Sequence, residues 1–101
     1  MSMNELIEKM RSGNKAATIE GLFHGGAIFR MDAIGYSAIF HYDDTEIIAR
    51  IRHLKDDLVT LDGYSVSDFA HAALDIMGVE PYCGDKITIK NLIELKFDFL
   101  M

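Results

Sequence analysis

The chain has 101 residues, of which 50% are hydrophobic and 26% are charged, and 16 acidic against 10 basic side chains give a formal net charge of −6. This composition is typical of a globular domain and excludes collagenous, repetitive and disordered chains. The acidic excess opposes the phosphate backbone of nucleic acids, so we expect no DNA or RNA as a direct partner.

Neither a membrane span nor a secretory signal is expected. The apolar runs are only a few residues long, and charged residues occur near the N-terminus where a signal peptide needs an apolar core. Cys83 is the only cysteine, which excludes an internal disulfide and a cysteine-based zinc site. These features predict a cytoplasmic protein that does not contact a membrane.

A short amphipathic helix is the first predicted element. Ser2 and Glu5 have the S-x-x-E spacing of a capping box. Leu6 and Met10 then fall on one apolar face, and Gly13 is suited to end the helix.

The next feature is a turn at His24-Gly25-Gly26. If residues 24–26 form a three-residue hairpin loop, Gly21 lies opposite Phe29 and one face of the hairpin is wholly apolar. The same register places Glu20 opposite Arg30 as a pair of opposite charges on the other face. We therefore expect Phe29 in the core.

The two glycines could instead belong to a phosphate-binding loop. Such a loop leads into a helix whose amide groups point at the anion. Residues 27–35 alternate in the manner of a strand, so we interpret residues 24–26 as a chain reversal.

A second tight turn at Ile34-Gly35 extends the same apolar face. Strands near residues 16–23, 27–33 and 36–42 then form a three-stranded antiparallel meander.

Two helices are predicted after the meander. Asp43-Asp44-Thr45-Glu46 resembles the start of the first, whose apolar stripe comprises Ile47, Ile51, Leu54 and Leu58. The basic residues in the run ARIRHLK, residues 49–55, are typical of a helix C-terminus. A turn follows at Asp62-Gly63. Ser65 and Asp68 then have the spacing of a capping box for the second helix, which ends at Gly78.

The C-terminal residues 86–101 alternate between apolar and polar types and predict one or two further strands. The whole order is a helix, a three-stranded meander, two helices and terminal strands. It predicts a single α+β domain over residues 1–101 with helices layered on one face of a mostly antiparallel sheet.

The histidines and the cysteine are the main candidates for catalysis or metal binding. The four histidines, His24, His41, His53 and His71, do not have the spacing of a metal-binding motif. Cys83 has no neighbouring base in the sequence to lower its pKa. We expect no enzyme, no metal site and no cofactor.

The second face of the predicted sheet carries an unexpected apolar group. It comprises Leu22, Ile28, Ile39 and His41, with Glu20 and Arg30 at its edge. Either the C-terminal strands or a helix covers this group, or it forms a partner-binding patch with an apolar centre and a charged rim.

The sequence therefore favours a small acidic binding module that acts on another protein, as bacterial or phage-encoded regulators and inhibitors do. The alternative is a small enzyme or ligand-binding protein whose site forms between protomers. Because so many apolar faces occur in so short a chain, we also expect a homodimer.

Overall fold

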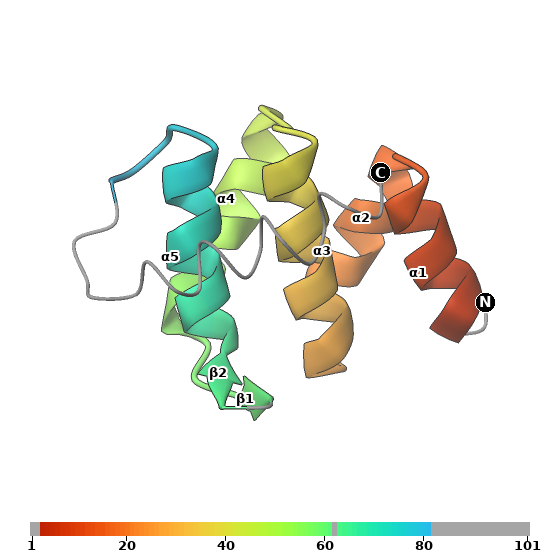
Figure 1. The fold of residues 1–101 in the computed structure, drawn as a ribbon, viewed down its shortest axis with the longest axis horizontal. Coiled ribbons are helices and arrows are strands. Elements are labelled where there is room, and N and C mark those ends of the chain that lie inside the picture. Colours follow the sequence, from red (N-terminus) through yellow and green to blue (C-terminus); the bar gives the residue numbers. More distant parts are fainter. Residues whose placement is uncertain (1–2, 62, 82–101) are drawn as a thin grey trace.

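The computed structural model describes residues 3–61 and 63–81, and these residues are mostly helical (Figure 1). The α-helices are α1 (Met3–Arg11), α2 (Lys15–Leu22), α3 (Ala27–Ile39), α4 (Thr45–His53) and α5 (Val66–Ile76). A 3-10 turn, η1 (Leu54–Asp56), follows α4, and β1 (Thr60–Leu61) pairs antiparallel with β2 (Tyr64–Ser65). Helix α3 packs between α2 on one side and α5 on the other.

The predicted α+β fold is wrong, because the expected meander is helical. Residues 16–23 belong mostly to α2, and the expected strands 27–33 and 36–42 fall mostly within α3. The expected turn at Ile34-Gly35 lies in the middle of that helix. Within the described residues, the only strands are the two short ones of the hairpin. The strands predicted for residues 86–101 lie outside the described part of the chain.

The reason lies in the burial of α3. All residues from Phe29 to Ala38 are buried, and α1, α2 and α5 pack against this helix. A helix that is covered on all sides needs no polar face, so its sequence lacks the 3.6-residue period of a surface helix. The alternation seen in residues 27–33 therefore did not reflect a strand. Phe29 does lie in the core, as predicted, but as part of a helix.

Helix α2 begins at a capping residue, Asn14, that was not predicted from the sequence. The side chain of Asn14 accepts a hydrogen bond from the backbone N–H of Ala17 at 3.0 Å, which satisfies one of the free amide groups of the first turn. Gly13 precedes Asn14 and has a φ of +90°, a conformation that glycine adopts without strain and that does not continue a helix. Helix α1 therefore ends just before Gly13, as predicted.

The other two predicted helices are confirmed. Both halves of the capping box between Ser65 and Asp68 are present at the start of α5. In α4, Ile47 and Ile51 are fully buried, and Leu54 is buried in η1. The expected stripe fails only at Leu58, which lies beyond the helix and is exposed.

A close approach of three helices occurs at Gly21 of α2. A methyl group on this residue would lie 2.8 Å from Sδ of Met10 in α1 and 3.0 Å from Cβ of Ala33 in α3. The methionine side chain can move, but Ala33 is fixed to the backbone of a buried helix. Glycine is therefore required here by space between helices rather than by a turn.

We expect Gly21→Val to lower the free energy of unfolding by about 1–3 kcal/mol, the usual cost of overpacking a core. Gly25→Ala is the matched control, because nothing lies within 4 Å of the added methyl group, and its effect should stay within about 0.5 kcal/mol. Urea denaturation followed by circular dichroism measures both. Equal midpoints for the two variants would contradict the close approach.

Candidate functional site

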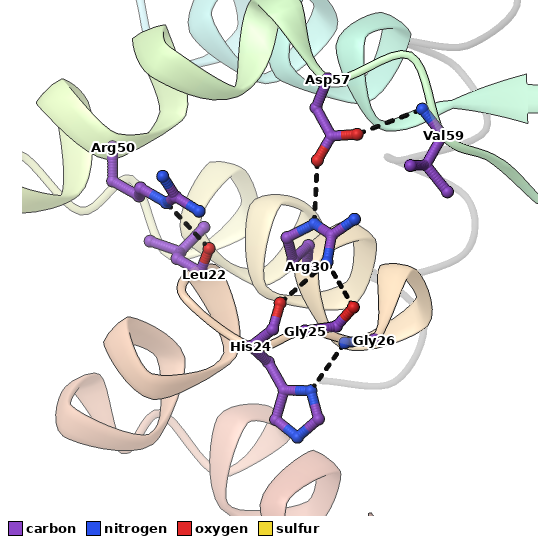
Figure 2. A network of polar contacts seen from close by, with 8 residues as sticks. All are labelled: Leu22, His24, Gly25, Gly26, Arg30, Arg50, Asp57 and Val59. Carbon is purple, nitrogen blue, oxygen red and sulfur yellow. Dashed lines mark hydrogen bonds and ion pairs between the residues drawn. The ribbon is translucent and has the colours of Figure 1, made fainter.

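A buried arginine of α3, Arg30, connects the turn before this helix to the segment after η1 (Figure 2). Its Nη1 donates hydrogen bonds to the carbonyl oxygens of His24 and Gly25, both at 2.8 Å. Its Nε donates to Oδ2 of Asp57 at 2.9 Å. The side chains of Arg30 and Asp57 are only 10% and 18% exposed, so this ion pair is largely shielded from water.

Asp57 extends the connection to the hairpin and to α5. Its second carboxylate oxygen, Oδ1, accepts a hydrogen bond from the backbone N–H of Val59 at 3.1 Å. Its carbonyl oxygen accepts from the N–H of Ser67 at 2.7 Å, and that of Val59 accepts from the N–H of Val66 at 2.9 Å. The backbone of residues 57–59 is thus held from both sides.

The turn at residues 24–26 satisfies its own polar groups. Gly26 donates its N–H to Nδ1 of His24 at 2.9 Å, and the histidine ring packs 4.1 Å from the ring of Phe29. The carbonyl groups of His24 and Gly25 are taken by Arg30. The predicted chain reversal is present, but it joins α2 to α3 and does not join two strands. The phosphate loop was rejected because a strand was expected after the turn, and that reason was wrong. These hydrogen bonds hold the turn in place.

All the large apolar side chains that are exposed in the described residues lie in the two segments that Arg30 connects. Phe23 and Ile28 flank the turn and are 57% and 41% exposed. Leu58 and Val59 follow Asp57 and are 76% and 49% exposed. Single exposed apolar residues are common, whereas apolar surface that gathers in one place is typical of an interaction site. Here the hydrogen bonds of Arg30 connect the backbones of the two segments. We call these four residues the Arg30-joined patch.

Only part of the predicted partner-binding group lies on this surface. Ile28 belongs to the Arg30-joined patch, and Glu20 is exposed on α2. Leu22 is fully buried, and Arg30 pairs with Asp57 rather than with the predicted Glu20.

Ile39 and His41 lie at the opposite end of α3 from Ile28. Eleven residues separate Ile28 from Ile39, or roughly 16 Å along the axis of a helix. Ile39 is half-buried against the core, and His41 is exposed with a φ of 50°. The expected single patch therefore does not form, because the predicted cross-strand neighbours are far apart on a helix.

Three members of the patch, Phe23, Leu58 and Val59, were not predicted from the sequence. The last turn of α4 contains Arg50, Arg52 and His53, and such a concentration of cations favours a helix end at this point. That signal would have placed Leu58 outside the helix. We find no comparable signal in the sequence for the exposure of Phe23.

Arg50 of α4 borders the patch at Phe23. Its Nε donates to the carbonyl oxygen of Leu22 at 3.0 Å, at the C-terminal end of α2, where the helix dipole favours a cation (Figure 2). Its guanidinium group lies 4.5 Å from the centre of the Phe23 ring. The two contacts together fix the position of this guanidinium on an otherwise exposed aromatic ring.

Two neighbouring cations, Arg52 and Lys55, share one acidic residue as their ion-pair partner. Glu80 accepts hydrogen bonds from Lys55 at 2.8 Å and from Arg52 at 2.6 Å. These bonds, that from Lys55 first, lower the pKa of Glu80 below its ordinary value of 4.5. The basic run 49–55 is thus paired at its end, near Lys55, while Arg50 faces Phe23.

We expect Asp57→Ala to lower the free energy of unfolding by about 3 kcal/mol, because Arg30 would remain buried without its counter-charge. Asp56→Ala, at an exposed neighbouring position, is the matched control and should change stability by less than about 0.5 kcal/mol. The double variant Arg30→Met with Asp57→Ala should lose less stability than the sum of the single changes. Additive losses in denaturant unfolding would show that the two side chains do not interact.

A second prediction concerns the pH dependence of stability through Glu80. Because its pKa is lowered in the folded state, its contribution is fully present above the unfolded value and is lost as the pH falls through the folded value. The stability difference between the wild type and Glu80→Gln should therefore shrink as the pH is lowered from neutral to about 3. A Glu80→Gln difference that is constant with pH would contradict the pairing.

Within the described residues, no helix has both the length and the apolar character needed to cross a membrane. In the same part of the chain, no group of three or more histidine, cysteine or acidic side chains is placed to hold a metal ion. Comparisons of the sequence with protein-family models and with curated proteins, and of the fold with solved structures, gave no match.

Proposed function

We propose that this protein is a non-enzymatic cytoplasmic binding module, a regulator or inhibitor of bacterial or phage type, that acts by contacting another protein through the Arg30-joined patch. One observation supports this proposal above the others. The large apolar side chains exposed in the described residues all lie on two segments that one shielded ion pair connects.

The composition and rigidity of the patch agree with this role. Aromatic residues and arginine are enriched at the centres of protein interfaces, and here Phe23 lies beneath Arg50. The hydrogen bonds of Arg30 and Asp57 already hold the backbone on which the apolar side chains stand. A surface that is ordered before binding loses less conformational entropy on association, so a small contact area can give useful affinity.

The cellular location and the type of partner belong to the same proposal. With one cysteine, the chain has no internal disulfide to protect, which agrees with a reducing cytoplasm. The negative net charge opposes a nucleic-acid partner. A second copy of this chain would be one form of protein partner, and the oligomeric state distinguishes it from a different protein.

The test replaces Leu58 or Ile28 with aspartate. Both side chains are exposed, so we expect the variants to keep the wild-type melting temperature within a few degrees and to lose the partner. Tagged wild-type and variant proteins are used for affinity capture from the native cells, with quantitative mass spectrometry. Partners that the wild type retains should fall at least about tenfold with Leu58→Asp.

Ala16→Asp is the matched control, because it adds the same charge at an exposed position near the other end of α2. It should retain every partner. Light scattering of the wild type and Leu58→Asp tests the homodimer: a dimer that becomes a monomer in the variant identifies a second copy as the partner. The proposed surface would be refuted if Leu58→Asp and Ile28→Asp both fold, retain the partners of the wild type, and have the same particle mass in light scattering as the wild type.

A further inference from the structure

Arg50 differs from the other cations near the Arg30-joined patch. Arg30 is paired with Asp57, and both Arg52 and Lys55 are paired with Glu80. Arg50 is not in an ion pair within the described residues; its contacts there are a carbonyl oxygen and an aromatic ring. Among the residues that the structure describes, Arg50 is thus a positive charge without a counter-charge at the edge of an apolar surface.

The orientation of Arg50 is also fixed. The Nε atom is used by the carbonyl oxygen of Leu22, and the group lies against Phe23. Figure 2 shows its two terminal nitrogens without a hydrogen bond to the residues drawn. A guanidinium group offers such terminal N–H groups as a planar fork that matches a carboxylate. Because the side chain is already ordered, a partner carboxylate would not have to order it.

We propose that the partner presents an acidic side chain to the terminal nitrogens of Arg50, next to an apolar side chain that packs on Phe23. The recognised element is therefore an acidic and apolar protein segment. This inference rests on the proposed function, since it names the chemistry of the partner at the same surface. The partner's apolar side chain would cover a ring that is 57% exposed, and its carboxylate would neutralise the bordering charge.

A carboxylate fits this site better than a phosphate group. A phosphorylated side chain carries a charge of about −1.5 to −2 and is usually bound by several cations. Here the two nearest cations in the sequence, Arg52 and Lys55, are occupied by Glu80. Within the described residues, Arg50 is then the cation of this run whose terminal N–H groups no acidic side chain occupies, and one such planar group is suited to a single carboxylate.

The experiment selects binders from a phage-displayed library of random peptides on immobilised wild-type protein, and counter-selects on Leu58→Asp to retain peptides that need the patch. We expect the retained peptides to carry aspartate or glutamate close to a leucine, isoleucine or aromatic residue. Their affinity, measured by calorimetry or fluorescence anisotropy, should fall about tenfold or more with Arg50→Met, which is the loss of one charge-assisted hydrogen bond. The affinity of Arg50→Lys for these peptides should lie between those of the wild type and Arg50→Met, because lysine keeps the positive charge but lacks the planar pair of N–H groups.

Two controls separate recognition from stability. Lys9→Met removes a positive charge from an exposed position on α1 and should leave peptide affinity unchanged. Replacing the acidic residue of a selected peptide by its amide should weaken binding to the wild type as Arg50→Met does, and should have little further effect on Arg50→Met. The peptide change leaves the protein intact, so this arm is valid even if Arg50→Met proves unstable.

The outcomes distinguish this inference from the function on which it rests. The role of Arg50 would be overturned, and the surface supported, by peptides that need Leu58 but have no acidic residue. Peptides that bind equally well after their acidic side chain is replaced by its amide would have the same meaning. A selection in which no peptide distinguishes the wild type from Leu58→Asp would overturn both.

Discussion

The ion pair between Arg30 and Asp57 is the constraint on which the surface of this protein depends. It forms between a residue of the central helix and a residue that comes shortly after the 3-10 turn, and it is mostly shielded from water. The same arginine also donates hydrogen bonds to two carbonyl oxygens in the turn before its own helix. One side chain therefore fixes two segments that are far apart in the sequence, and the exposed apolar residues lie on these segments.

The helical scaffold behind this pair depends on close packing around α3. Small residues such as Gly21 and Ala33 allow neighbouring helices to approach, so α3 is buried along most of its length. A central helix of this kind gives the ion pair a firm base, since its backbone cannot shift without disturbing the core. Close packing and the hydrogen bonds of Arg30 thus both stabilise the position of α3.

The parts of the fold that could be predicted are those with local signals. Ser65 with Asp68 marked the start of α5, and the acidic cluster before Thr45 marked α4. Helix α3 was not recognised because its burial on all sides removed the amphipathic period. Helix α2 was not recognised because its buried face consists of small or polar residues, Ala17, Thr18 and Gly21, with Leu22 as the only large apolar side chain. At the site, Glu20, Ile28 and His41 are exposed as predicted, but only Ile28 belongs to the Arg30-joined patch. The pairing of Arg30 with Asp57 bridges 27 positions of sequence and leaves no local pattern.

The exposed apolar residues have a consequence for how such a protein can change over generations. Phe23, Leu58 and Val59 belong to segments that connect helices, and their side chains are exposed. Their replacement therefore alters what the surface contacts at little cost to the stability of the fold. Arg30 and Asp57 do not have this freedom. Diverging copies of the chain could therefore acquire new partners one substitution at a time while retaining the same scaffold, much as loops on a rigid framework do.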